Sequence, residues 1–188
     1  MQAEPIAGIP EAAAHPILPL AQTDGPVLGG RCILVAEDDA DDVFLLRRAL
    51  QKAGLGHRLL DVADGQRVVE YLDGLPPFDD RTRYPFPDLL LLDLKMPRMS
   101  GLEVLQWLDA RPDLKALPVV VLSSSPLEAD CEQATHLGAR EFQTKPGQIT
   151  QLIDLLRSLH DRWLADAPLV PRDRWSVPRS QPGILARA

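Results

Sequence analysis

The chain has 188 residues, of which 45% are hydrophobic and 25% are charged, so it is long enough for one globular domain with a buried core. Its formal net charge of −7 at pH 7 argues against nucleic acid or an anionic membrane surface as a direct partner, because both attract basic faces. The sequence contains no apolar run of about 18 residues and no signal-peptide pattern, so we expect a cytoplasmic protein without a transmembrane helix.

The two ends of the chain differ in composition from its middle. Residues 1–29 and 168–188 are rich in proline and show no helical or strand period, so we predict a flexible N-terminal arm, an ordered domain over 30–167 and a flexible C-terminal tail. The two cysteines, Cys32 and Cys131, lie in strand-like and helix-like runs. We interpret both as buried free thiols; a disulfide is the alternative.

Between the arms, strand-like and helix-like runs alternate five times. Strands are predicted at 32–36, 57–63, 89–92, 119–122 and 140–142. Helices are predicted at 41–53, 66–72, 102–110, 127–137 and 148–164. The first, third and fourth strands are continuous apolar runs, which is typical of strands covered on both faces. Strict alternation predicts an α/β fold with a parallel sheet and helices on both faces.

Polar side chains follow these strands where ligands bind in open parallel sheets, at the carboxyl ends. Glu37-Asp38-Asp39 follow the first strand and Asp93 the third, while Ser123 ends the fourth and Lys145 follows the fifth. Carboxylates gathered at one edge repel one another unless a cation is present, and a small cluster of oxygen ligands favours Mg²⁺. A carboxylate that attacks phosphorus needs such a cation, and a hydroxyl and a lysine to hold the transferring oxygens.

Five segments in order resemble the receiver domain of bacterial response regulators. They are Ile-Leu-Val-Ala-Glu-Asp-Asp (33–39), Pro-Asp-Leu-Leu-Leu-Leu-Asp-Leu-Lys-Met-Pro (87–97), Met-Ser-Gly-Leu-Glu-Val-Leu (99–105), Leu-Pro-Val-Val-Val-Leu-Ser-Ser (117–124) and Lys-Pro (145–146). The resemblance spans about residues 31–164. It implies a flavodoxin-like (CheY-like), doubly wound, five-stranded parallel sheet of order 2-1-3-4-5.

The resemblance also implies a role for each motif residue. Asp93 corresponds to the phosphoacceptor. The Mg²⁺ ligands would be Asp38, Asp93 and the backbone carbonyl of Lys95, with Glu37 acting through water.

Three further residues match positions that respond to the phosphoryl group. Ser123 corresponds to the hydroxyl switch, Lys145 to the lysine that pairs with the acyl phosphate, and Phe142 to the aromatic switch position. Phe142 is equally consistent with plain core packing.

The resemblance implies a phosphoacceptor rather than an enzyme, which assists its own phosphorylation and slow dephosphorylation. Its donor would be a sensor histidine kinase, and its output would pass through protein contacts. The acidic segment 38–42, the loop 75–87 and the long last helix are similar to the small regulators paired with bacterial phytochrome kinases. Lys95, where small or amide side chains are common, predicts slow loss of phosphate.

Two further interpretations concern the helices. Asp39, Asp41 and Asp42 could be additional metal ligands, but we interpret them as residues that cap the first helix and match its dipole. The last helix is apolar over a wide arc, with Leu155 off the centre of its stripe, so a homodimer through this helix is our hypothesis. The four histidines have no metal-like spacing, and we expect ordinary surface or helix roles for them.

Three other functions compete with the leading one. A Mg²⁺-dependent phosphohydrolase would need a second Asp two residues after the first, where Lys95 stands. An interaction domain that is never phosphorylated has no need for the complete set of acceptor, acid pair, hydroxyl and lysine. Flavin binding would need a Ser/Thr/Gly-rich phosphate loop after the first strand, and that position is acidic here.

Overall fold

The computed structural model describes residues 30–124 and 127–166. The predicted arms, 1–29 and 168–188, lie outside the described residues, so the predicted domain limits stay a prediction.

The centre of the fold is a five-stranded parallel sheet of order β2-β1-β3-β4-β5. The strands are β1 (Cys32–Ala36), β2 (Arg58–Val62), β3 (Leu89–Leu92), β4 (Val119–Ser123) and β5 (Glu141–Thr144). The predicted fold class and strand order are confirmed. β5 starts one residue later and ends two residues later than predicted, because it is a half-buried edge strand of mixed polarity with no apolar run to mark its ends.

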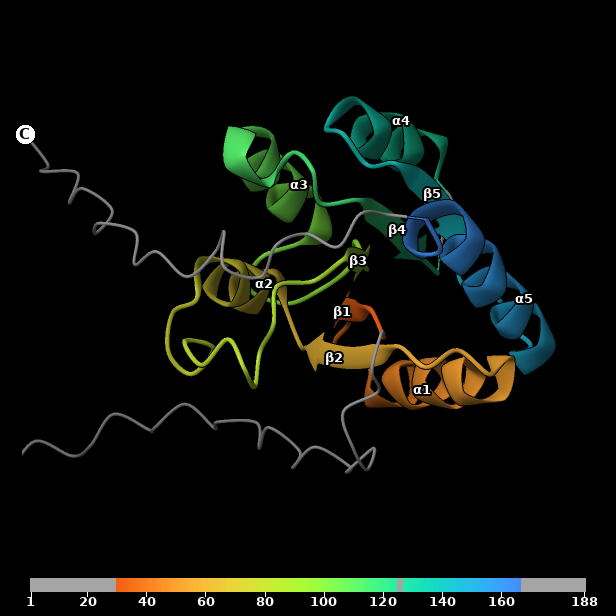
Figure 1. Cartoon of the computed structure of the whole chain (residues 1–188). Coiled ribbons are helices and arrows are strands. Elements are labelled where there is room, and N and C mark those ends of the chain that lie inside the picture. Colours follow the sequence, from red (N-terminus) through yellow and green to blue (C-terminus); the bar gives the residue numbers. More distant parts are fainter. Residues whose placement is uncertain (1–29, 125–126, 167–188) are drawn as a thin grey trace, which may run out of the picture.

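Helices cover both faces of the sheet (Figure 1). They are α1 (Ala40–Ala53), α2 (Gly65–Asp73), α3 (Gly101–Asp109), α4 (Glu128–His136) and α5 (Ile149–Leu159). α1 and α5 pack on one face around Ile33 and Val35, and α2, α3 and α4 pack on the other around Leu34 and Ala36. Since successive side chains of a strand point to opposite faces, this alternation produces two apolar layers and a fully buried β1.

The last helix changes its hydrogen-bonding pattern near its end. After α5, residues His160–Leu164 continue as a π-helix, and the Ala165 N–H donates to the His160 carbonyl at 2.8 Å. Because the strands are parallel and α5 runs back along them, this turn lies at the amino-terminal edge of the sheet, opposite the carboxyl ends of the strands.

Two smaller expectations have clear outcomes. Within the part of the chain that the structure covers, no helix is long and apolar enough to cross a membrane. Both cysteines are free thiols, as predicted. Cys32 is buried, but Cys131 is only half-buried, because α4 exposes most of its side chains and buries only Ala134 deeply.

Candidate phosphoryl and metal site

An acidic cluster lies at the carboxyl edge of the sheet, as the order of the motifs predicts. Glu37 and Asp38 follow β1, Asp93 follows β3, and each contributes a carboxylate oxygen to a group in which all lie within 4.8 Å of one another. Glu37 and Asp93 are each 5% exposed, whereas Asp38 is exposed. The two neighbouring strands thus bring together the predicted acceptor and the predicted acid pair.

Lys145, which follows the edge strand β5, contacts this cluster at the same carboxyl edge of the sheet. Its Nζ lies 2.6 Å from Glu37 Oε2, 2.8 Å from Asp42 Oδ2 and 3.4 Å from Asp93 Oδ2. Burial alone would lower the pKa of Lys145, but hydrogen bonds to the carboxylates of Asp42 and Glu37 outweigh it, so this pKa is raised. The lysine therefore stays charged and offsets part of the buried negative charge.

Glu37 shows how incomplete that compensation is. Burial raises the pKa of Glu37, with the Asp93 carboxylate acting in the same direction, although the ammonium of Lys145 opposes both. Three carboxylates, from Glu37, Asp42 and Asp93, pair with the ammonium of Lys145, and Asp38 adds a fourth negative group beside Glu37 and Asp93. The edge therefore has an excess of negative charge that a divalent cation would balance.

The backbone around Asp93 fixes its side chain. The Leu94 N–H donates to Asp93 Oδ1 at 2.7 Å, which leaves Oδ2 on the side of Lys145. Gly101, the first residue of α3, packs so closely against this turn that a Cβ built on it would lie 2.2 Å from the Asp93 carbonyl oxygen. Ser100 and Glu103 close a reciprocal capping box at the same helix end. A glycine is needed here because α3 starts against the backbone of the acceptor.

The loop between β3 and α3 is tied to α2. Arg98, which has a positive φ of 65°, forms an ion pair with the fully buried carboxylate of Asp64, the N-cap of α2. The Gly65 N–H donates to the Met99 carbonyl at 3.0 Å. Lys95 lies in this loop with its side chain exposed, next to the acceptor. Its carbonyl as a metal ligand stays a prediction.

The two predicted switch residues occupy different environments. Ser123 ends β4 and is fully buried, and its carbonyl accepts the Lys145 N–H at 2.8 Å, so the hydroxyl residue and the lysine are linked through the backbone. Phe142 is partly buried and packs against the core formed with α2, α3 and α4. The structure is compatible with both interpretations of Phe142.

Sequence reasoning missed one member of this site. Of the three aspartates interpreted as caps, Asp39 caps α1 and accepts the Asp41 N–H at 2.8 Å. Asp42 also lies in the first turn, but its carboxylate pairs with Lys145. The available signal was its position directly before Val43, a residue of the buried stripe, which places Asp42 beside the sheet at the same edge.

A contact between two histidines was also not predicted from the sequence. His57 precedes β2 and His160 starts the π-helical turn, and His57 Nε2 lies 3.0 Å from His160 Nδ1. The Arg31 N–H donates to His57 Nδ1 at 3.2 Å, so the proton of the neutral His57 ring resides on Nε2. This contact joins segments that are far apart in sequence at the amino edge, and no local pattern reports it.

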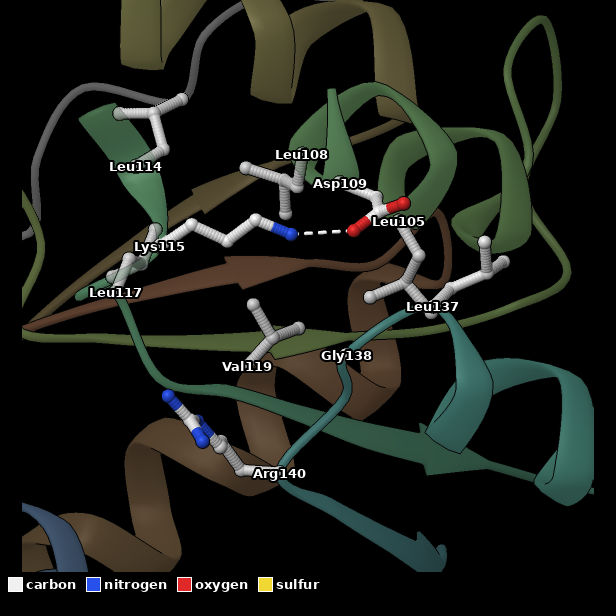
Figure 2. Close-up of a pocket in the computed structure, with 10 residues that line it drawn as sticks. All are labelled: Leu105, Leu108, Asp109, Leu114, Lys115, Leu117, Val119, Leu137, Gly138 and Arg140. Atoms are coloured by element: carbon white, nitrogen blue, oxygen red, sulfur yellow. Dashed lines mark hydrogen bonds and ion pairs between the residues drawn. The ribbon is translucent and has the colours of Figure 1, made fainter. Parts of the chain in front are cut away.

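A cavity of about 180 Å³ also lies at the amino edge, away from the predicted site (Figure 2). Leucines from α3 and from the segment before β4 form its apolar lining, and Lys115 pairs with Asp109 beside it. None of the predicted site residues lines it. The candidate site instead lies at a charged sheet edge, where a smaller hollow of about 30 Å³ is lined in part by Glu37, Asp42 and Lys145.

The donor set of the acidic cluster fits a hard divalent cation. Its ligands are carboxylate oxygens, two of them nearly buried, and the ammonium of Lys145 is within contact distance of the same groups. Three protein carboxylates leave coordination positions for water and for a phosphoryl oxygen, which is characteristic of Mg²⁺ or Mn²⁺ sites rather than a closed Ca²⁺ cage.

Comparison with known families agrees with this fold. Residues 33–157 match the response regulator receiver domain. The chain therefore belongs to the response regulator receiver family.

Its similar relatives include phytochrome response regulators. The chain is 31% identical over 139 residues to the response regulator Rcp1 of Synechocystis, covering 74% of this chain and 92% of Rcp1. A Mn²⁺-bound form of Rcp1 has a similar structure, with 30% identity, a TM-score of 0.65, and coverage of 75% of this chain and 99% of Rcp1.

Two further solved structures are similar over nearly their whole length. RPA3017, from red light signalling in R. palustris, has 32% identity and a TM-score of 0.70 over 75% of this chain and 99% of its own. The phosphorylated cyanobacterial phytochrome response regulator RcpA has 32% identity and a TM-score of 0.66 over 74% and 97%.

Proposed function

We propose that this chain is the response regulator of a two-component phosphorelay and that Asp93 accepts the phosphoryl group. The observation that supports this most directly is the convergence of Glu37, Asp38, Asp93 and Lys145 at one sheet edge, with the acceptor fixed by the backbone of its neighbour. The chain would act as a phosphoacceptor rather than as an enzyme with its own substrate.

The reaction is an in-line transfer of a phosphoryl group to a carboxylate. An oxygen of Asp93 forms a bond to phosphorus while the bond from phosphorus to the phosphohistidine nitrogen of the donor breaks, and the histidine keeps that electron pair. The buried Asp93 carboxylate becomes an acyl phosphate. Lys145, 3.4 Å from Asp93 Oδ2 before the reaction, supplies a cation for the phosphoryl oxygens, and the Ser123 hydroxyl donates a hydrogen bond to one of them.

Mg²⁺, when bound, would offset negative charge on the carboxylates and on the incoming phosphoryl oxygens. Asp38, Asp93 and the Lys95 carbonyl would hold it, with Glu37 linked through water. The Mn²⁺ in the similar regulator Rcp1 supports this assignment, as does the excess of carboxylates at this edge.

The direct test is phosphorylation with a small phosphodonor. Incubation of the full chain with acetyl phosphate and Mg²⁺ should raise the intact mass by one phosphoryl group. Asp93→Asn should show no increase, and removal of Mg²⁺ with a chelator should abolish the increase in the wild type. The control is Asp61→Asn, an exposed β2 carboxylate away from the site, which should gain mass like the wild type. A phosphoryl group on Asp93→Asn would refute the assignment.

The phosphodonor that we propose is a sensor histidine kinase, specifically a bacterial phytochrome. The similarity to the phytochrome response regulator RcpA and to RPA3017 of red light signalling, each over nearly its whole length, supports this choice. Transfer of label from an autophosphorylated bacteriophytochrome should be fast, and transfer from an unrelated histidine kinase at the same concentration should be slow. Equal rates from both kinases would remove the phytochrome assignment.

Output would pass through protein contacts in the cytoplasm, including a homodimer through the last helix. Ile153 and Leu155 of α5 are only partly buried against the chain's own core, which leaves apolar surface on that helix. The net charge of −7 supports a protein partner rather than nucleic acid or a membrane. Sedimentation of a monomer at micromolar concentration, with and without phosphorylation, would contradict the dimer.

A further inference from the structure

Lys145 has one partner that lies outside the acidic cluster. The carboxylate of Asp42, from the first turn of α1, lies 2.8 Å from Lys145 Nζ. Asp42 is not among the residues whose oxygens group around a candidate metal position, which are Glu37, Asp38 and Asp93. Asp42 therefore contacts the lysine and is not a candidate ligand of the metal ion.

The distances show where the ammonium group is held. Nζ is 2.6 Å from Glu37 and 2.8 Å from Asp42, which are lengths of charge-assisted hydrogen bonds, but 3.4 Å from Asp93. An ammonium group has three donors and can serve all three carboxylates, yet its two short contacts lie on the side of β1 and α1. In the unphosphorylated site, the ammonium of Lys145 thus lies closer to Glu37 and Asp42 than to the acceptor.

Phosphorylation changes this balance. A phosphoryl group on Asp93 replaces the single charge of the carboxylate with nearly two negative charges and adds three acceptor oxygens beside the acceptor. Lys145 has to move toward these oxygens to pair with them, and the contact with Asp42 lengthens as it does. Asp42 and the phosphoryl group therefore compete for one cation.

We propose that Asp42 is a positioning residue that retains Lys145 on the α1 side of the site and so opposes uptake of the phosphoryl group. This inference rests on the proposed function, since it assumes that Asp93 is the acceptor. It also makes the first turn of α1 sensitive to phosphorylation, because the departure of Lys145 leaves the Asp42 carboxylate without that partner.

The test is the affinity for beryllofluoride, a tetrahedral analogue of the phosphoryl group, measured by calorimetry on the full chain with saturating Mg²⁺. Asp42→Asn keeps the shape of the side chain and removes its charge, and it should bind about threefold to fivefold more tightly than the wild type. Asp42→Glu retains the charge on a longer side chain and should return the affinity toward the wild-type value. The affinity for Mg²⁺ alone should change much less than that for beryllofluoride.

Asp41→Asn is the matched control, because it removes the same charge from the same helical turn. Asp41 is exposed and is not among the partners of Lys145 in the described part of the chain. It should change the affinity by less than about twofold. In a Lys145→Met background, Asp42→Asn and Asp41→Asn should have equal effects, because the cation for which Asp42 competes is gone.

The outcomes separate this inference from the proposed function. A wild type that binds no beryllofluoride and gains no phosphoryl group would refute both. A wild type that binds beryllofluoride, with Asp42→Asn equal to Asp41→Asn or weaker than the wild type, would refute only the role of Asp42. An equal gain in the presence and absence of Lys145 would show that Asp42 acts through general charge repulsion, which also overturns the inference.

Discussion

The two edges of the sheet manage charge in opposite ways. At the carboxyl edge, three carboxylates pair with the ammonium of Lys145 and Asp38 adds a fourth negative group, and burial raises the pKa of Glu37. At the amino edge, the ionic groups are matched and tie the last helix to the strands. The contacts there are Arg31 with Asp88 and the Leu164 carbonyl, His57 with His160, and Glu141 with Arg162 and Trp163.

This difference separates a reactive edge from a structural one. Matched, hydrogen-bonded groups contribute to stability and have little affinity for an additional ion. An unbalanced cluster is destabilising until a cation binds, and proteins retain such clusters where they bind or react. The comparison therefore predicts that substitutions and solution conditions act mainly on ligand binding at one edge and on folding at the other.

The substitution that we expect to be most damaging alters the backbone packing at the carboxyl edge. Gly101→Ala places a Cβ 2.2 Å from the Asp93 carbonyl oxygen, so α3 or the acceptor turn has to shift. We expect a loss of about 3 kcal/mol in the free energy of unfolding, measured by urea denaturation, together with slower phosphorylation. Gly147→Ala is the control, since nothing lies within 4 Å of its Cβ position. Equal stability of the two variants would show that the close approach is not a constraint.

The sequence predicts which residues meet at the carboxyl edge better than it predicts their individual contacts. Leu89–Leu92 was predicted to the residue, because a strand buried on both faces leaves an unbroken apolar run. The convergence of Glu37, Asp93 and Lys145 followed from strand polarity alone, since parallel strands end at the same edge. The position of each residue directly after its strand was enough to predict this convergence, because a parallel sheet brings the carboxyl ends of its strands together.

Other features could not be predicted from the sequence. The pair of Asp42 with Lys145 depends on how α1 docks beside α5, and the His57–His160 contact depends on how α5 returns to the amino edge. Both contacts join residues 103 apart in the chain, and neither leaves a periodic signal. β5, at Glu141–Thr144, was misplaced because an edge strand of mixed polarity has no clear ends.

The second prediction concerns the effect of a divalent cation on the stability of the carboxyl edge. Mg²⁺ at ten times its dissociation constant should raise the free energy of unfolding by about 1.4 kcal/mol, because it binds the folded chain alone. Asp38→Asn removes an exposed member of the cluster and should abolish this gain without a large change in metal-free stability. Asp61→Asn, an exposed β2 carboxylate that pairs with Arg47 away from the cluster, should keep the gain. A gain that persists in Asp38→Asn would place the cation elsewhere.

The third prediction concerns the amino edge and pH. Burial, followed by the neighbouring His160, lowers the pKa of His57, so the folded protein takes up this proton less readily than the unfolded chain does. The stability that neutral His57 contributes is therefore complete above the ordinary histidine pKa of about 6.5, and it is lost as the pH falls through that value toward the lower folded pKa. Protonation of His57 also places an N–H on Nδ1, against the Arg31 N–H that donates to this atom in the neutral ring.

Between about pH 7.5 and about pH 5.5, we expect the free energy of unfolding to decrease by about 1 kcal/mol more in the wild type than in His57→Gln. This difference is the typical contribution of one hydrogen bond. Urea denaturation at both pH values measures this difference. His136→Gln, which removes an exposed histidine of α4, should behave like the wild type. A pH dependence that is unchanged in His57→Gln would show that the pair does not contribute to the structural edge.

The smallest effect concerns the rim of the carboxyl edge, where the cation of Lys95 lies exposed in the loop after the acceptor. We expect phosphorylated Asp93 to lose its phosphoryl group slowly, because this cation holds phosphoryl oxygens or crowds the hydrolytic water. Lys95→Asn should therefore shorten the phosphoryl half-life by about threefold, a modest change because an exposed charge is screened by solvent. Intact mass followed over time after removal of the phosphodonor measures the half-life, and Lys115→Asn, an exposed lysine at the amino edge, is the matched control. A half-life in Lys95→Asn that is unchanged or longer would mean that Lys95 does not protect the acyl phosphate. The buried groups around Asp93 would then determine its lifetime.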